Sequence, residues 1–366
     1  MTLYEKVFKV LALLGLTALV LWVLWEGRTI LLYFLVASVI ALIGRPLFHL
    51  LEKIQIRGKQ LPRSLTAMIA LLILAGAVFG TIGIFFPLLM REAQVLYGIN
   101  FADVKDSLSP AISNANRFLE NLGFNEFAGM NEGAFLGYVF GSIDFRSLPS
   151  VINNVLGVFG NALIAVFSVA FMTYFLLRDE GILPRIVLAV TPSSHEKSAK
   201  HIIDRTRRTL TRYFIGLVLQ VTAITLCVWL GLSLIGVKNA LLIGFFTGLA
   251  NLIPYLGPWI GATFGVIIMV SNNMGMGFYE VIVPKFYALL AVFAVTQLID
   301  NYVFQPVIFS TSIHAHPLEI FIVILLAGSL GGILAMVAAI PTYAFIRIVL
   351  IELNREFGVL EAIKKR

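Results

Sequence analysis

One ionisable side chain stands out inside the apolar runs of this sequence, the carboxylate of Asp300. Gln297 lies three residues before it, a step that puts both side chains on one helix face, and Asn301 follows it directly. Because a carboxylate within a membrane is energetically costly, it usually marks a proton or ion relay or a contact with a substrate. The alternative is a position near a helix end at the membrane interface, where the charge costs little. These three residues are candidate ligands for a polar solute or a cation.

A second polar interruption, NLIPYLGPWIG, occupies residues 251–261. It falls in the run 240–270, which is otherwise apolar and long enough to cross a membrane as one helix. The interrupting residues are polar or helix-breaking: Asn251, Pro254, Tyr255, Gly257 and Pro258. Each proline removes a backbone donor, and lipid cannot satisfy the polar groups of such a break. The break is tolerated only where it is buried in protein or lines a cavity, which makes it a second candidate site.

Other chemistries are not indicated. His314 and His316 lack a third ligand, so no metal site is expected. The apolar segments contain no Ser/His/Asp set, no His-Glu metal pair and no phosphate-binding Gly-rich Lys motif. We therefore expect neither an enzyme nor an ATP-driven pump, and no cofactor other than a coupling ion, H⁺ or Na⁺.

Composition decides the class of protein. The 366 residues are 59% hydrophobic and only 13% charged, which is too apolar for a soluble protein. The formal charge of +7 could suggest nucleic acid, but the basic residues lie in short loops between apolar segments, where they encode topology. The sequence predicts an all-α polytopic membrane protein that contacts the lipid bilayer and no nucleic acid.

The first half of the chain alternates apolar spans with charged loops. Four segments are predicted to span the membrane, at about 7–25, 30–44, 65–90 and 151–177. The basic loop 45–63 is predicted to be cytoplasmic, as is the N-terminus, and the mainly acidic segment 91–150, with an amphipathic helix, lies outside. The basic stretch 185–212 is again cytoplasmic. Within it, Ser193 and Glu196 have capping-box spacing for a helix that runs toward Arg212.

The second half contains two units with the same plan. Each has a full span, at about 213–235 or 279–303, followed by two apolar halves parted by a break. The second break is glycine-rich and its second half contains a proline: Gly328, Gly331, Gly332 and Pro341. At 1.5 Å per residue the shorter halves fall well short of a hydrocarbon core of about 30 Å.

Two interpretations of these broken segments stay open. Short halves suit re-entrant hairpins, which would invert the second unit relative to the first, as in the inverted repeats of secondary transporters. Alternatively, each broken segment is one long kinked span, giving eight spans in all. Glycines spaced four apart favour hairpins, because a small-xxx-small face lets backbones approach. Both interpretations leave the C-terminus in the cytoplasm.

The predicted regions are 1–90 (three spans), 91–150 (outer segment), 151–212 (fourth span and basic connector), 213–350 (transport core) and 351–366 (basic tail).

Four motifs carry a family resemblance. They are RPL at 45–47 with LPRSL at 61–65, YFLLRD at 174–179, NLIPYLGP at 251–258, and QLIDNYVFQP at 297–306 followed by HPL at 316–318 and AIP at 339–341. Together these resemble the AI-2E family, the autoinducer-2 exporter-like bacterial transporters. The resemblance implies a transporter of the bacterial inner membrane that forms homo-oligomers, with pentamers expected. Members have been linked to export of the quorum-sensing signal autoinducer-2 and, in some branches, to sodium or lithium/proton antiport.

The sequence departs from the family pattern at three positions. The family usually has Glu where Asp300 stands, and another glycine where Ala335 stands. It often has Gln directly after Gly216, whereas here Leu217 follows and Gln220 lies one turn on. Since two of these positions fall at presumed polar contacts, the identity of the substrate cannot be carried over.

We therefore expect a secondary transporter that exports a small polar solute, autoinducer-2-like, by alternating access; the alternative is a sodium (lithium)/proton antiporter. In this hypothesis the tips 251–258 and 328–332 meet near the midplane. The predicted contacts to solute or cation are Asp300, Gln297, Asn301, Asn251, Tyr255 and Gln220. Protonation of Asp300 would be the simplest coupling event, because burial favours the neutral form.

Overall fold

The computed structural model describes residues 25–56, 59–97, 148–273, 276–306 and 316–357, with isolated positions between 15 and 23. The side chains of 148–162 are not described. Most of the predicted first span, nearly all of the outer segment, the loop around His314 and the end of the basic tail lie outside these residues.

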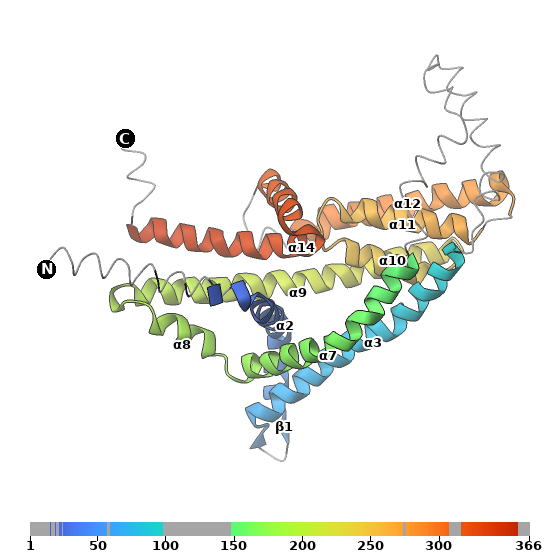
Figure 1. Ribbon diagram of the computed structural model, residues 1–366. Helices are drawn as coiled ribbons and strands as arrows, with labels where there is room; N and C mark the ends of the chain where they lie inside the picture. The colour runs from blue at the N-terminus through green and yellow to red at the C-terminus, as the bar shows by residue number, and fades with distance from the viewer. Residues whose placement is uncertain are drawn as a thin grey trace, which may run out of the picture. The chain divides into compact units, whose positions relative to one another are not determined.

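The described chain is almost entirely helical (Figure 1). In chain order its elements are α2 (Arg28–Glu52), β1 (Gln55–Ile56), β2 (Lys59–Gln60), α3 (Arg63–Tyr97), α7 (Leu148–Arg178), α8 (Ile182–Ala189), η2 (Ser193–His195), α9 (Glu196–Leu234), α10 (Ala240–Ala250), α11 (Gly257–Ser271), η3 (Phe278–Ile282), α12 (Val283–Ile299), η4 (Asp300–Phe304) and α14 (Pro317–Phe357). The two strands form one short antiparallel pair.

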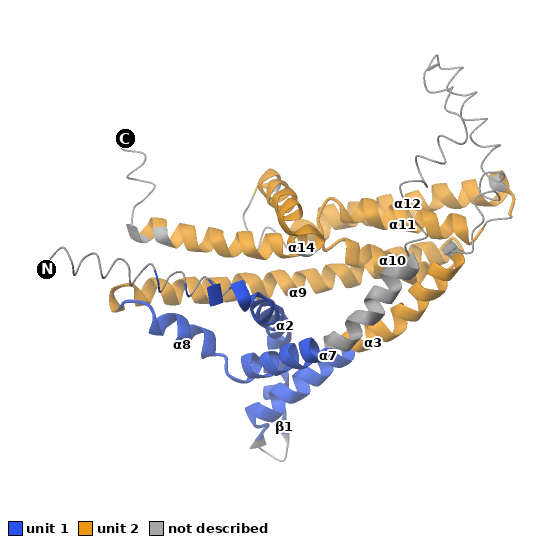
Figure 2. Cartoon of the chain, viewed as in Figure 1, with its two compact units in different colours: residues 1–77, 156–192 blue, residues 78–155, 193–366 orange. Residues whose placement is uncertain are grey.

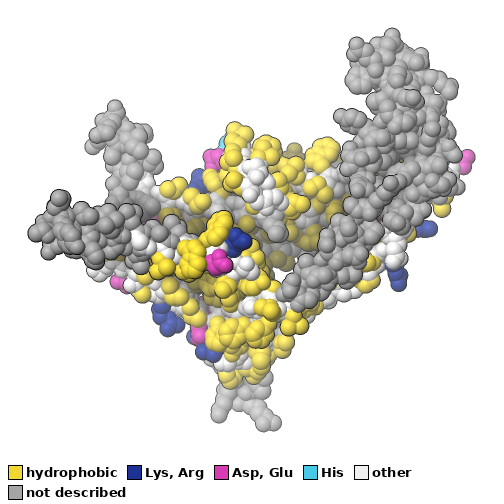
Figure 3. Space-filling view, viewed as in Figure 1, with side chains coloured by type: hydrophobic (Ala, Val, Ile, Leu, Met, Phe, Trp, Pro, Cys, Tyr) yellow, Lys and Arg dark blue, Asp and Glu magenta, His cyan; other side chains and the backbone are white. Residues whose placement is uncertain are grey.

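Five helical stretches in the described residues are long and apolar enough to cross a membrane: Arg28–Glu52, Arg63–Val95, Ser193–Leu234, Tyr279–Phe304 and Ala335–Glu352. Four shorter apolar helices accompany them, at Leu163–Arg178, Ala240–Ala250, Gly257–Ser271 and Leu318–Ile333. Hydrophobic side chains cover much of the described surface in Figure 3, with few charged ones among them. A surface of this kind needs lipid rather than water around it, which confirms the multi-pass membrane protein that composition predicted.

The chain divides into two compact units (Figure 2): residues 1–77 with 156–192, and residues 78–155 with 193–366. The core of the first unit joins α2, the start of α3 and the end of α7. It consists of alanines, two leucines and one phenylalanine: Ala37, Ala41, Phe48, Ala67, Ala70, Leu176 and Leu177. The four alanines let these helices approach closely, in the manner of small-residue contacts between membrane helices.

Helix α2 is longer than its apolar pattern predicted. The predicted span ended at Gly44 and assigned Arg45 to a loop, but α2 continues through Pro46 to Glu52. Proline costs a helix one hydrogen bond. Phe48 is only 2% exposed in the core of the first unit, and Leu47 and Leu51 pack against that core. Burial of this last turn outweighs the bond that Pro46 removes.

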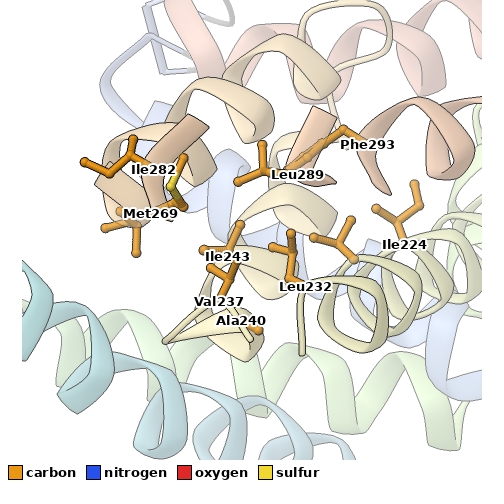
Figure 4. Close-up of a cluster of buried hydrophobic side chains, with 11 residues drawn as sticks. Ile224, Leu232, Val237, Ala240, Ile243, Met269, Ile282, Leu289 and Phe293 are labelled. Atoms are coloured by element: carbon orange, nitrogen blue, oxygen red, sulfur yellow. The ribbon is translucent and has the colours of Figure 1, made fainter. Parts of the chain in front are cut away.

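The larger core belongs to the second unit and lies among α9, α10, α11, η3 and α12 (Figure 4). Its members are Ile224, Val228, Leu232, Val237, Ala240, Ile243, Ile268, Met269, Ile282, Leu289 and Phe293. Val228, Leu232 and Leu289 have no exposed surface at all. This core fixes α10 and α11 against the two long helices that carry Gln220 and Asp300.

Helix α9 runs without a break from the basic stretch into the apolar span. The capping box predicted at Ser193 is wrong, because Ser193 lies in the 3₁₀ turn η2 and α9 begins at Glu196. His195 is the N-cap residue and makes no side-chain capping bond. The helix itself, running toward Arg212, was predicted correctly.

Helices α10 and α11 form an antiparallel hairpin. A Cβ added at Gly261 would lie 2.7 Å from Cγ2 of Thr247, and one at Gly257 would overlap the backbone of Ala250 and Asn251. Since Gly261 and Thr247 stand equally far from the break, the two helices run side by side in opposite directions. The glycines of α11 therefore form the contact surface inside this hairpin, whereas Gly244 and Gly248 of α10 face α9, at Thr225.

The second broken segment also folds back on itself. The backbone leaves the helical region at Gly331 (φ −147°) and Gly332 (φ 64°), within the residues spanned by α14. On either side of this break, a Cβ at Gly328 would meet Met336, and Tyr343 donates a hydrogen bond to Glu319. The two halves of α14, before and after Gly331, thus contact each other along their length. The placement of either hairpin in a membrane, and the inverted repeat, stay predictions.

Candidate functional site

Asp300 lies on the buried face of the long helix that begins at η3. Leu289, Phe293 and Thr296 precede it at steps of three or four, and all three are buried. This spacing forms one stripe of an α-helix, so Asp300 continues the face that packs into the protein. It is 1% exposed.

Three carboxamides from three parts of the chain donate hydrogen bonds to the Asp300 carboxylate. Gln220 Nε2 on α9 lies 2.6 Å from Oδ1. Gln305 Nε2 lies 2.9 Å from Oδ2, and Asn251 Nδ2, in the α10–α11 tip, lies 3.3 Å from the same oxygen. Two of the predicted residues, Asn251 and Gln220, are thereby brought to Asp300, although 49 and 80 residues separate them from it.

The π-helix η4 explains why Gln305 reaches Asp300. In an α-helix, side chains five residues apart point about 140° away from each other. Here the backbone N–H of Gln305 bonds to the carbonyl of Asp300, the five-residue step of a π-helix, which brings the two side chains onto one side. Gln305 was not predicted, because nothing in QLIDNYVFQP distinguishes a π turn from an ordinary helical one.

Gln220 belongs to the buried stripe of α9. Ile224, Val228 and Leu232 continue that stripe at steps of four, and Gln220 itself is 5% exposed. The amide therefore occupies a position where the pattern calls for an apolar residue. Its bond to Asp300 satisfies one of its polar groups in this interior position.

Asn251 is held in place by the turn between α10 and α11. It caps the C-terminal end of α10, donates its backbone N–H to Thr247 and is 5% exposed. Pro258 stands in the first turn of α11, where a backbone N–H would have no partner within the helix, so its absence costs no hydrogen bond. Tyr255 has φ 68°, a conformation that is costly for a bulky residue and recurs at functional sites.

Other predicted residues lie away from the carboxylate. Gln297 donates to Asn301 Oδ1 at 2.9 Å rather than to Asp300, and Gln305 bridges to that oxygen at 3.0 Å. The Tyr255 ring packs edge-on against Phe321, 5.9 Å between centroids. Phe321 lies ten residues before Gly331, which is about 15 Å along a helix. This contact of the first tip is therefore to the body of the second hairpin, and that the two tips meet stays a prediction.

The second tip has the character of a surface. Gly331 and Gly332 are exposed, and their neighbours Leu330 and Ile333 are 87% and 70% exposed. Pro341 lies further along α14, next to the buried residues Ala339 and Ile340. None of these residues supplies a bond to Asp300 among those found in the described chain.

The electrostatics of the site follow from its partners. All three donors to Asp300 are neutral amides, so the carboxylate is hydrogen-bonded without a cation among those partners. A carboxylate offers about four acceptor positions, and these bonds use three. Each amide also carries a carbonyl oxygen, which can accept a hydrogen bond or contact a cation. Among the described residues no group of three His, Cys, Asp or Glu could hold a metal.

Comparison with known proteins identifies the chain. The model of the family described as AI-2E family transporter matches residues 11–355. The chain belongs to the AI-2E transporter family. Two proteins of Bacillus subtilis (strain 168) that are named for transport are similar to it. YueF is 26% identical over 326 residues, covering 86% of this chain and 81% of YueF. YrrI is 24% identical over 313 residues, covering 82% of this chain and 81% of YrrI.

A third relative comes from an archaeon. MJ1177 of Methanocaldococcus jannaschii, also named for transport, is 21% identical over 316 residues, 86% of each chain. Membership of the AI-2E family confirms the resemblance read from the four motifs. Together with the long apolar helices it supports a membrane transporter.

This AI-2E family member holds a second buried carboxylate, whose burial was not predicted from the sequence. Glu92 was counted among the acids of the outer segment, but it lies in α3 and is 3% exposed. Its Oε2 accepts from Asn239 Nδ2 at 2.5 Å and its Oε1 from Asn272 Nδ2 at 2.6 Å. Asn239 caps the start of α10 and Asn272 the end of α11, so Glu92 joins the two open ends of the hairpin.

Lys285 belongs to the same end of the hairpin. Its Nζ donates to Asn273 Oδ1 at 2.8 Å, beside the Asn272 amide that binds Glu92. The α10–α11 hairpin of this AI-2E transporter therefore has a polar anchor at each end, Asp300 at the tip and Glu92 at the opening.

Proposed function

We propose that the protein is a secondary transporter that exports a small polar solute, of the autoinducer-2 type, by alternating access around its broken helices. The observation that carries this proposal is the buried Asp300 carboxylate, held by Gln220, Asn251 and Gln305 where a helix is interrupted. Secondary transporters bind their substrates at broken helices of this kind.

The chemistry of the site suits a hydroxyl-rich solute. Such a molecule both donates and accepts hydrogen bonds. The carboxylate and the amide carbonyls can accept from its hydroxyl groups, while the amide N–H groups can donate to its oxygens. Binding would exchange the bonds among the four side chains for bonds to the solute, so that few polar groups are left unpaired.

The alternating step requires the tip of the α10–α11 hairpin to part from Asp300. Asn251 makes the longest of the three bonds, 3.3 Å, and Tyr255 in the same tip holds a strained backbone conformation. These features support a tip that changes its contacts while the glycine-packed body of the hairpin moves as one piece. In this scheme Gln220 and Gln305 keep the carboxylate in place.

Sodium (lithium)/proton antiport is the second candidate, favoured because the partners of Asp300 among the described residues include no cation. A buried charge without an opposite charge is costly, and a proton or a bound cation would remove it. Carboxylate and carbonyl oxygens are the ligands that hard cations prefer, and the C-terminal end of a half-helix such as α10 adds a negative pole. One carboxylate that takes either ion in turn would couple their opposite movements.

The experiment compares the wild type with Asp300→Asn in proteoliposomes that hold a pH-sensitive dye. Sodium pulses and counterflow of labelled autoinducer-2 are measured side by side. Asp204→Asn is the matched control, because it makes the same chemical change on α9 at a half-exposed position. We expect solute counterflow in the wild type and the control, and its loss in Asp300→Asn.

Two other results would change the conclusion. Sodium-driven alkalinisation without solute counterflow, lost in Asp300→Asn, would establish the antiporter and exclude the exporter. Flux with an unchanged pH dependence in Asp300→Asn would show that this carboxylate has no coupling role.

A further inference from the structure

A polar pocket of about 320 Å³ lies where the start of α9 meets the end of α14, well away in sequence from the Asp300 site. Its lining comes from two helices of the second unit: Lys197, Ser198, His201, Glu352 and Arg355. Ligand pockets in proteins begin at about this volume. Helices α9 and α14 pack against each other and run in opposite directions (Figure 1), and His201 of α9 lies opposite Glu352 of α14.

The charges in the pocket leave an excess of cations. Glu352 is 6% exposed and its Oε2 lies 3.7 Å from His201 Nε2, so this carboxylate is engaged within the pocket wall. The side chains of Lys197 and Arg355 line the same space and make no hydrogen bond or ion pair with another residue of the described chain. With His201 neutral the formal charge of the lining is +1, and with His201 protonated it is +2. The Ser198 hydroxyl can add a hydrogen bond to an anion.

The surface beside the pocket is apolar. Ile351 lies one helical turn before Arg355 on the same side of α14 and is 42% exposed. Leu350 and Ile346 are also exposed, at 60% and 49%, but they lie on the side of α14 that faces away from Arg355. A free phosphate ion gains nothing from an apolar neighbour. A phospholipid does, because an acyl chain would lie along Ile351 while the headgroup faces the cations.

We propose that this pocket binds the phosphate group of an anionic phospholipid. Lys197 and Arg355 contact the phosphate oxygens, Ser198 donates to one of them, and the exposed side chain of Ile351 contacts an acyl chain. Basic pockets between membrane helices bind anionic headgroups by this combination of charge and depth. The pocket would fasten the cytoplasmic extension of α9 to the end of α14 through a lipid.

The test uses full-length protein in detergent, titrated with dioleoyl phosphatidylglycerol, and counts bound lipids by native mass spectrometry. The pocket variant is Lys197→Gln/Arg355→Gln. The control variant, Lys200→Gln/Arg208→Gln, also removes one Lys and one Arg from exposed positions, neither of which lines the pocket. We expect the pocket variant to bind phosphatidylglycerol about tenfold more weakly than the wild type, and the control to be unchanged. Phosphatidylcholine should bind weakly to all three.

Equal losses in both variants, or no loss in the pocket variant, would overturn the proposal, because the attraction would then be diffuse or located elsewhere. Inorganic phosphate distinguishes the source of the ligand. Millimolar phosphate should not raise the melting temperature of the wild type, whereas phosphatidylglycerol should. An equal rise with inorganic phosphate would assign the pocket to a soluble anion and exclude the lipid. The melting temperatures of the two variants without lipid should agree, which shows that both fold.

Discussion

The two hairpins of the second unit share a plan but differ at their tips. The tip between α10 and α11 carries a buried asparagine that binds a buried carboxylate. The tip within α14 carries Leu330 and Ile333, which are 87% and 70% exposed. A shared plan of span and broken helix therefore does not mean two equivalent binding sites. In this chain the first hairpin holds the polar chemistry and the second presents an apolar edge.

The open ends of the two hairpins also differ in how deeply the groups that close them are buried. The first hairpin is closed by Glu92 of α3, through Asn239 and Asn272. The second is closed within itself, because Tyr343 donates to Glu319 and Arg347 lies 3.7 Å from the same acid, which is half exposed. Burial thus separates the two: the first hairpin has a buried polar anchor at each end, whereas the acid that joins the open end of the second is half exposed. The changes below test this difference.

The largest effect is expected at Gly257, where α10 and α11 come closest. In Gly257→Val the new side chain would overlap the backbone of Ala250 and Asn251, which cannot move without displacing the tip. We expect a loss of about 3 kcal/mol of stability, the upper range for overpacking. The measurement is thermal unfolding of the purified protein in detergent. The control is Gly80→Val on α3, where an added Cβ meets nothing within 4 Å. A melting temperature for Gly257→Val equal to that of the control would show that the hairpin is not closely packed.

The next largest effect is expected at Gln220, the partner with the shortest bond to Asp300. Gln220→Met keeps the length of the side chain and removes the donor, so Oδ1 of the carboxylate loses its partner in a buried site. This should cost about 1–3 kcal/mol. In the double variant with Asp300→Leu the two losses should not add, because the bond they share is already absent in either single variant. Additive losses would show that Gln220 acts independently of the carboxylate.

Much of this arrangement could be predicted from sequence, and the exceptions have physical causes. Asp300 and the 251–258 break stood out because charge, proline and asparagine contrast with an apolar background, and the glycine spacing in α11 predicted the hairpin contact. Gln305 was missed because its position depends on a π turn. Glu92 was missed because it follows Arg91 at the end of an apolar run, where an acid is usual at an interface. The continuation of α2 past Pro46 depends on the burial of Phe48, which a local pattern does not reveal.

A smaller effect is expected at Gly332, in the second tip. Its backbone, at φ 64° and ψ −154°, lies in a region that is essentially limited to glycine. Gly332→Ala should therefore cost about 1 kcal/mol through backbone strain alone, because an added Cβ meets nothing within 4 Å. Gly83→Ala on α3, with equally open surroundings, is the control and should be neutral or slightly stabilising. If both variants melt at the same temperature, the break in α14 does not depend on this glycine.

The smallest effect is expected from the apolar edge of the second tip. Leu330→Ser and Ile333→Ser replace side chains that bury little surface within the chain, so each should change stability by less than about 0.5 kcal/mol. The matched comparison is Ile324→Ser in the same hairpin. There the side chain is 1% exposed and its loss should cost several times more. Thermal unfolding in detergent at high dilution isolates the single chain. A large loss at Leu330 or Ile333 under those conditions would mean that the second tip is covered by the chain itself, and the contrast between a buried first tip and an exposed second tip would then fail.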